Sequence, residues 1–296
     1  MNRNIGQKAE NGALFSLIVS MVIFGTIGIF RRHIPLPSSL IAMMRGLIGM
    51  LFLLAVLRLR GQRMDRGAIR ANAPMLLLSG ALLGFNWIAL FEAYRYTSVA
   101  TATLCYYMAP IIVILVSPVL LGERLTGVKL ACVLGALAGM VLVSGILQTG
   151  FAGVQEIAGV LFGLGAAALY AGVILTNKRI HGISAYDKTI VQLGTSAVLL
   201  LPYTLLTENL TAVSMQPGAW LLLLLVGVVH TGMAYWLYFG CMSALRAQTV
   251  ALLSYIDPVV AIFLSALLLG ERMTPAGAAG AALVLGATVI SELSER

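Results

Sequence analysis

The sequence predicts an all-α membrane protein with ten transmembrane helices, built as two inverted five-helix repeats. Hydrophobic residues make up 60% of the 296-residue chain and charged residues only 10%, and the mean hydropathy is +0.97. A soluble domain carries about a quarter charged residues, so the composition is that of a membrane protein. A second observation is the number of long apolar segments, and a third is that a heptapeptide of the first half returns in the second half.

Ten apolar segments are long enough to span a bilayer, because about 20 apolar residues cross its hydrocarbon core as a helix. The predicted spans are 13–30, 38–57, 74–94, 98–121, 127–147, 157–177, 185–206, 218–240, 247–269 and 275–293. We therefore expect a first repeat over residues 1–147, a connecting loop over 148–156 and a second repeat over 157–296.

The duplication shows at the end of each half. The segment Leu120–Thr126 returns 148 residues later as Leu268–Thr274, with Gly-Glu-Arg in the same place. In the same gapless register from Leu104 and Leu252 onward, 11 of 23 positions are identical. Thr126 and the pair Thr274-Pro275 are expected to cap the helices that follow these turns.

The distribution of basic residues predicts the orientation of the chain. With a cytoplasmic N-terminus, 14 of the 19 Lys and Arg residues fall on the inner side and 4 on the outer side, and Arg45 lies within a span. Cytoplasmic loops collect Lys and Arg, so both termini are expected in the cytoplasm. Because each repeat has five helices, the second copy enters the membrane in the opposite direction. Such inverted repeats place a substrate site near the midplane between the halves.

The same composition argues against other classes of protein. The net charge of +8 is spread over short loops, which membrane topology explains better than nucleic-acid binding. The sequence contains no HExxH, no Gly-x-Ser-x-Gly and no P-loop, so we expect neither an enzyme nor an ATP-driven pump. Cys105, Cys132 and Cys241 lack metal-type spacing, and no metal or cofactor is predicted.

Two matching signatures carry a resemblance to a known family. The first runs from Tyr94–Ala100 through Pro110 to the turn 122–124, and the second from Ala244-Leu245 through Pro258 to the turn 270–272. In these the chain resembles the EamA-type ten-helix members of the drug/metabolite transporter superfamily. The resemblance implies a carrier in a bacterial inner membrane, whose substrates in the family range from amino acids and other metabolites to organic cations and drugs. It also implies that the last helix of each half, 127–147 and 275–293, is peripheral to a central cavity.

Two prolines fall mid-span. Pro110 frees the carbonyl of Tyr106, and Pro258 frees the carbonyl of Ser254, because proline has no backbone N–H. Freed carbonyls at membrane depth line a cavity or find other partners. Both prolines are candidates for hinges, and a fixed kink that improves packing is the alternative.

Asp257 is the candidate that matters most for function, because its counterpart in the first repeat is Ala109 and it lies near the midplane. A carboxylate there costs about 2.5–3.5 kcal/mol on insertion scales and is usually functional or paired. It could bind a substrate ammonium or take up a coupling proton, and the structural alternatives are a salt bridge with Arg45 or a bond to a hydroxyl. Arg45 and Gln192 occupy corresponding helices and suggest either a structural network or a clamp for a substrate carboxylate.

Further candidates fall on the inner helices. His230 lies near mid-depth and suits a proton relay or a neutral hydrogen bond in the core. Glu92 suits a gate, or a local ion pair with Arg95 three residues away. The aromatic and amide candidates for lining the cavity are Asn86, Trp87, Tyr106, Tyr107, Tyr170, Tyr235, Trp236 and Tyr255.

These features predict a secondary transporter, an exporter or exchanger of small polar metabolites such as amino acids. An efflux carrier for organic cations and drugs is the alternative. The expected partners are a small-molecule solute and the lipid bilayer, with a proton or solute counter-gradient as the driving force and no nucleic acid. Gly135 and Gly139 form a GxxxG that predicts close helix packing, within the chain or at a dimer face, so monomer and homodimer both stay open.

Overall fold

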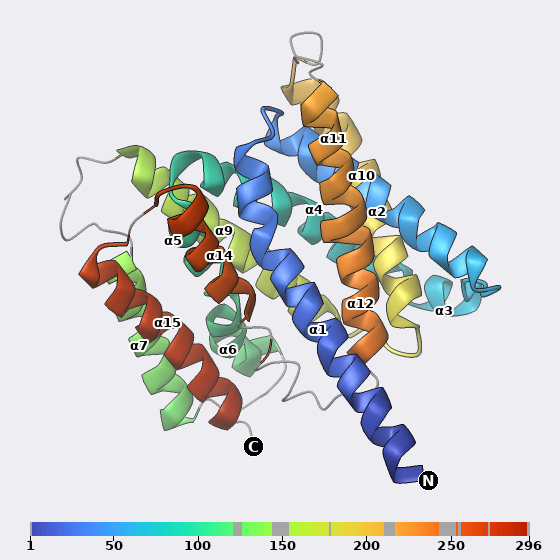
Figure 1. Cartoon of the computed structure of the whole chain (residues 1–296), viewed down its shortest axis with the longest axis horizontal. Coiled ribbons are helices and arrows are strands. Elements are labelled where there is room, and N and C mark those ends of the chain that lie inside the picture. Colours follow the sequence, from blue (N-terminus) through green and yellow to red (C-terminus); the bar gives the residue numbers. More distant parts are fainter. Residues whose placement is uncertain are drawn as a thin grey trace.

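The computed structural model describes residues 2–120, 126–143, 154–177, 179–209, 217–242, 253, 256–271 and 273–294 (Figure 1). These residues are almost entirely helical, with no β-strand among them. In chain order the elements are α1 (Asn2–Arg32), α2 (Ser38–Leu59), α3 (Arg66–Ala71), α4 (Ala73–Tyr96), α5 (Val99–Tyr106), α6 (Ala109–Leu120), α7 (Gly127–Val143), α9 (Val154–Asn177), α10 (Ala185–Thr207), α11 (Pro217–Leu225), the π-helical η3 (Val226–Met233), α12 (Ala234–Met242), α14 (Ile256–Leu268) and α15 (Pro275–Ser294).

The described helices have the length and composition of membrane spans. Seven are long and apolar enough to cross a bilayer, and three shorter apolar helices lie where the remaining spans are predicted. The all-α membrane fold predicted from the sequence is confirmed. The turn at 122–124 and most of the 148–156 joint lie outside the described residues.

The predicted span 98–121 is not one continuous helix, which corrects the sequence-based boundary. It is divided into α5 and α6 by a turn at Tyr107 and Met108. Pro110 is the second residue of α6, where its missing N–H costs nothing, whereas inside a longer helix it would clash with the preceding turn. The chain therefore stops and restarts just before the proline.

In the second half, α14 begins at Ile256, so Asp257 and Pro258 lie in its first turn. A helix N-terminus favours negative charge because the backbone dipoles sum to a partial positive charge there. The carboxylate of Asp257 thus sits at a position that is electrostatically better than the middle of a helix.

Helix packing groups the spans into two bundles. The α1 bundle consists of α1, α2, α11, η3, α12 and α14, with α1 packed on α12 and α14 and α2 packed on η3. The α9 bundle consists of α4, α5, α6, α9 and α10, with α9 packed on α4, α5 and α6 and α10 packed on α4. The two sets of contacts correspond: if each helix is replaced by its counterpart in the other predicted repeat, such as α1 by α9 and α2 by α10, one set becomes the other. Across the bundles, α2 packs on α10, and the buried side chains of Ile41, Phe91 and Leu193 lie in the core they share with α4.

The closing helices α7 and α15 lie side by side at one edge of the molecule (Figure 1). Their closest approach is at Gly139, where an added Cβ would lie 2.7 Å from the backbone oxygen of Gly280. The predicted close packing of the GxxxG segment is therefore confirmed as a contact within the chain. Side chains of Thr126 and Thr274 accept hydrogen bonds from the N–H groups of Lys129 and Gly277, at 3.3 and 3.0 Å, as expected for the caps of α7 and α15.

Candidate functional site

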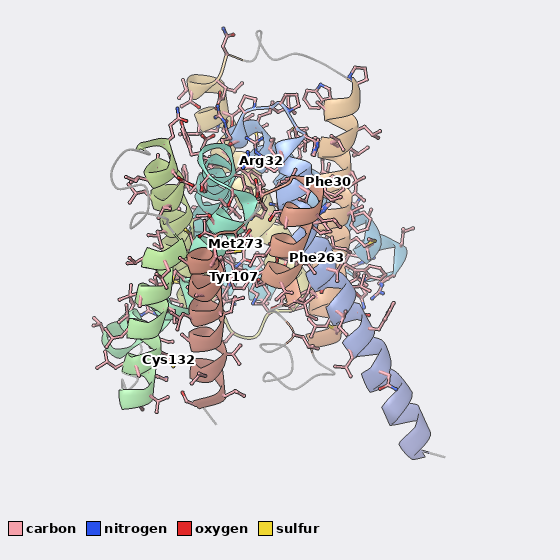
Figure 2. All side chains as sticks on the ribbon, turned by 60° about the vertical axis from the view of Figure 1, so that its left-hand side comes forward. Phe30, Arg32, Tyr107, Cys132, Phe263 and Met273 are labelled. Atoms are coloured by element: carbon pink, nitrogen blue, oxygen red, sulfur yellow. The ribbon has the colours of Figure 1, made fainter. Side chains whose placement is uncertain are left out.

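A cavity of about 390 Å³ lies between the two bundles. The α1 bundle contributes side chains from α1, α2, α12 and α14, and the α9 bundle contributes side chains from α4, α5, α9 and the break between α5 and α6. The lining consists of Met21, Phe24, Ile27, Arg45, Trp87, Leu90, Tyr94, Thr103, Tyr106, Tyr107, Ala109, Tyr170, Ile174, Tyr235, Tyr238 and Asp257. Figure 2 shows Tyr107 near mid-height of the molecule, with Arg32 nearer the end where α1 finishes.

Asp257 and Tyr107 meet in this cavity from opposite bundles. The Tyr107 hydroxyl donates a hydrogen bond to Oδ2 of Asp257 at 2.9 Å. Tyr107 sits in the break that precedes Pro110, and Asp257 directly precedes Pro258, so a residue beside the mid-span proline of each repeat reaches the cavity. Ala109, the counterpart of Asp257, also lines it. The two repeats therefore place corresponding residues in the cavity, but only the second repeat has a carboxylate at this position.

The position of Asp257 depends on a close contact with α1. A Cβ added to Gly25 would lie 2.6 Å from the backbone oxygen of Asp257 and 2.8 Å from Cβ of Val260. Glycine is therefore required for α1 to approach the first turn of α14 this closely. Next to it on the same helix, Met21, Phe24 and Ile27 face the cavity at intervals of three residues.

Arg45 reaches the same cavity from α2 and is 3% exposed. Its guanidinium lies 4.2 Å from the ring centroid of Trp87, and its Nε donates to Oγ1 of Thr231 at 3.0 Å. Among the residues that the structure describes, ion pairs join Arg32 to Glu271 and Arg95 to Glu92, but none joins Arg45 to Asp257. The cavity therefore contains both a cationic and an anionic side chain that do not neutralise each other by direct contact.

The partner of Arg45, Thr231, lies in the π-helical stretch η3. Its hydroxyl bonds the carbonyl of Val226, five residues earlier, at 3.2 Å, which matches the wider turn of a π-helix. Added Cβ atoms on Gly227 and Gly49 would meet Ile48 and Thr231 at 2.6 Å. Small residues on both sides thus let α2 and η3 approach closely and hold the guanidinium in place.

Five other candidates from the sequence do not line this cavity and instead contact residues elsewhere in the molecule. Nε2 of His230 bonds Oγ1 of Thr26 at 2.8 Å, and its ring packs against Phe30 with centroids 4.7 Å apart. Nδ2 of Asn86 donates to the carbonyl of Ala166 at 2.6 Å.

Nε2 of Gln192 donates to Oγ of Ser79 at 2.8 Å and to Oδ1 of Asn177 at 2.6 Å. The carboxylate of Glu92 pairs with Arg95 at 3.0 Å, three residues along α4. Gln192 and Arg45 therefore belong to separate networks. Trp236 lies near Arg60 instead, with the guanidinium 5.2 Å from its ring centroid.

The remaining candidates are Trp87, Tyr106, Tyr170 and Tyr235, which line the cavity, together with Pro258, which is buried in α14. Tyr255 and the side chain of Pro110 lie outside the described residues. The lining residues Tyr94, Thr103 and Tyr238 and the side chains of α1 were not predicted from the sequence. The side chains from α1 are apolar and indistinguishable in type from lipid-facing ones, although their spacing beside Gly25 and Gly28 was an available signal.

A helical membrane bundle that encloses a polar and aromatic cavity between two sets of helices is the architecture of a solute transporter. The chain belongs to the EamA-like transporter family, which it matches over residues 11–145 and 157–292.

Similar proteins agree with this assignment. The uncharacterized transporter YxxF of Bacillus subtilis is 30% identical over 271 residues, which cover 91% of this chain and 86% of that protein. The aromatic amino acid exporter YddG of Ancylobacter novellus is 26% identical over 220 residues, 73% of this chain and 75% of the relative. The chloramphenicol-sensitive protein RarD of Pseudomonas aeruginosa is 29% identical over 280 residues, 89% and 87% of the two chains. A crystal structure with a TM-score of 0.67 and 21% identity covers 96% of this chain and 97% of its own, and it shares the fold.

Proposed function

We propose that this protein is a secondary transporter that exports or exchanges small polar metabolites such as amino acids, by alternating access around the cavity between the two bundles. The observation that carries the proposal is the presence of Asp257 and Arg45 in one cavity without an ion pair between them. A zwitterion carries an ammonium and a carboxylate, and so it satisfies both side chains at once.

The aromatic lining supports a substrate that also has an apolar part. Six tyrosines and Trp87 surround the two charges. Their rings offer apolar contact, and their hydroxyl groups offer hydrogen bonds. The volume lies within the range of about 300–1,000 Å³ that is usual for small-molecule sites. The relative named as an aromatic amino acid exporter has a substrate of this chemical type.

The predicted inverted repeat supplies the mechanism. We propose that residues 1–147 and 157–296 form the two repeats, with both termini on the cytoplasmic side of the inner membrane. The exchange symmetry of the helix contacts supports two equivalent halves, and the 14:4 bias of basic residues supports the orientation. As the candidate hinges, Pro110 and Pro258 would let each half bend beside the substrate.

The energy for transport must come from a gradient, because the sequence has no P-loop. Asp257 is the group that would couple transport to protons, since a carboxylate can be neutral in one state of the cycle and charged in the other. Exchange of one solute for another needs no such step. A pH gradient imposed across proteoliposomes separates the two cases.

The second candidate is efflux of organic cations. Asp257 surrounded by aromatic rings also suits a cation that lacks a carboxylate. One relative is named for chloramphenicol sensitivity, which supports keeping drugs among the candidate substrates. Arg45 decides between the two, because a cationic substrate gains nothing from a guanidinium in the same cavity.

The test is counterflow in proteoliposomes that contain only this protein and are preloaded with unlabelled amino acids or organic cations. Labelled amino acid should accumulate, and Asp257→Asn should reduce the apparent affinity by roughly ten- to a hundred-fold, the loss expected from one hydrogen bond to a charged group. Glu92→Gln makes the same chemical change outside the cavity and serves as the matched control. Accumulation of cations alone would shift the assignment to cation efflux, and no accumulation of either class would refute the proposal.

A further inference from the structure

Three chain segments meet at the end of the molecule where α1 finishes. They are the last turn of α1, the turn between α4 and α5, and the residues that follow α14. Nη2 of Arg32 donates to Oε1 of Glu271 at 3.1 Å and to the carbonyl of Thr97 at 2.6 Å. The other carboxylate oxygen, Oε2 of Glu271, accepts a hydrogen bond from the N–H of Val99 at 2.9 Å. Arg32 and Glu271 together therefore clamp the two ends of the α4–α5 turn.

The sequence builds this clamp from ordinary helix-end chemistry. Gly270 has a φ of +67°, a left-handed conformation that glycine adopts without strain, and it reverses the chain just after α14. Glu271 is thereby directed back to the N-terminus of α5, where a carboxylate is favoured by the helix dipole. Arg32 lies in the last turn of α1, where a cation is favoured for the same reason.

The clamp joins the two bundles. Arg32 and Glu271 belong to the α1 bundle, whereas Thr97 and Val99 belong to the α9 bundle. The ion pair itself stays within one bundle. The two hydrogen bonds to the α4–α5 turn cross from one bundle to the other, so these are the contacts that must break when the bundles separate at this end.

The clamp also lies directly beyond the cavity. The lining residues nearest to it along the chain are Ile27 on α1, Tyr94 on α4 and Thr103 on α5. Arg32 is five residues beyond Ile27, Thr97 is three residues beyond Tyr94, and Val99 is four residues before Thr103. At 1.5 Å per residue the clamp therefore lies roughly 4–8 Å past the lining. Between them Val99 is 0% exposed and packs against Gly28. That packing and the clamp therefore lie between the cavity and this end of the molecule.

We propose that Arg32 and Glu271 are positioning residues of the transport cycle: they hold the α4–α5 turn against the α1 bundle, keep this end of the cavity shut, and release the turn when the carrier opens to this face. This inference rests on the proposed alternating-access function. With the predicted topology, the face is the outer one. In the second repeat, the duplicated Gly-Glu-Arg turn therefore does more than reverse the chain: its Glu271 also holds the α4–α5 turn.

A nearby ion pair provides the control. Glu92 and Arg95 are joined at 3.0 Å within the last two turns of α4, and so the pair lies within a single helix. Glu92→Gln removes a carboxylate from the same region and leaves the hydrogen bonds of the clamp intact. A change produced by Glu271→Gln but not by Glu92→Gln is therefore caused by the clamp and not by a general loss of charge.

The test measures access to the cavity and requires no knowledge of the substrate. Cys105, Cys132 and Cys241 are replaced by alanine, and Ile27→Cys supplies a reporter in the cavity lining. A membrane-impermeant maleimide is then applied to oriented vesicles from the face opposite the N-terminus. We expect slow labelling in the parent protein and labelling about tenfold faster or more in Arg32→Gln and Glu271→Gln, because a hydrogen bond to a charged group is lost in each. Labelling should stay slow in Glu92→Gln.

Exchanging the two charges gives the sharpest outcome. In Arg32→Glu with Glu271→Arg the ion pair can form again, but a carboxylate then faces the Thr97 carbonyl and a guanidinium faces the Val99 N–H. The clamp therefore predicts that labelling stays fast in the double variant. Slow labelling in the double variant, slow labelling in Glu271→Gln, or equally fast labelling in Glu92→Gln would overturn the proposal. Fast labelling of a clamp variant together with no counterflow of any solute would instead refute transport while leaving the clamp in place.

Discussion

Gly25→Ala is the substitution whose effect can be worked out most directly from the structure. The added methyl group would lie 2.6 Å from the backbone oxygen of Asp257, where ordinary van der Waals contact begins at 3.4 Å. The neighbour is backbone and cannot rotate away, so α1 and the first turn of α14 must separate by about 0.8 Å. Overpacking of this kind typically costs about 1–3 kcal/mol.

The same displacement changes the position of the Asp257 carboxylate relative to Tyr107 and the cavity. A misplacement of about 1 Å at a reacting or binding group can cost on the order of a hundredfold in rate. We therefore expect Gly25→Ala to lower the unfolding temperature in detergent and to reduce counterflow strongly. Thermal unfolding followed by counterflow in the same preparation measures both effects.

Gly165→Ala is the matched control, because Gly165 lies inside α9 with no atom within 4 Å of an added Cβ. Alanine is favoured over glycine within a helix by about 1 kcal/mol, so this variant should be at least as stable as the parent. If Gly25→Ala unfolds at the same temperature as Gly165→Ala and transports at the parental rate, the close contact between α1 and Asp257 is not required and the reasoning fails.

Three further substitutions test other parts of the structure. Arg45→Gln should weaken binding of amino acids by roughly ten- to a hundred-fold while leaving organic cations unaffected, which competition in the counterflow assay would measure. Gly139→Val should destabilise the α7–α15 contact by about 1–3 kcal/mol, read as a lower unfolding temperature; an unchanged temperature would contradict the packing described for it. Thr274→Ala should cost about 1 kcal/mol through the lost cap of α15 without changing the affinity for solute, and a changed affinity would mean that the cap influences the cavity.

Features that depend only on neighbouring residues in the chain, such as spans and helix caps, could be predicted from the sequence. The spans follow from apolar length, and the caps at Thr126 and Thr274 follow from residue type. Asp257 was recognisable because a carboxylate among apolar residues is costly, and it does line the cavity. The break at Tyr107 was missed, since the periodicity of a helix continues across it and only the proline two residues later signals the interruption.

Other features depend on which helices become neighbours, and a single sequence carries little of that information. His230 and Asn86 have the residue types of a polar site, yet each bonds an adjacent helix, at Thr26 and Ala166, and neither lines the cavity. One hydrogen bond of the clamp joins Glu271 to Val99, which are 172 positions apart in the chain. The residues around Glu271 predict a turn, but they do not reveal its partners on α1 and α5, which are known only from the structure.

The contact between α7 and α15 also determines when, during synthesis of the chain, α7 can pack against its partner. The face of α7 around Gly139 packs on a helix that begins only at Pro275, near the end of the chain. At ribosomal rates of about 5–20 residues per second, α7 waits on the order of ten seconds in the membrane before that partner has been synthesised. During this interval its small-residue face is available to any other helix of the same kind. A chain that stops before Pro275 keeps this face of α7 without its partner helix.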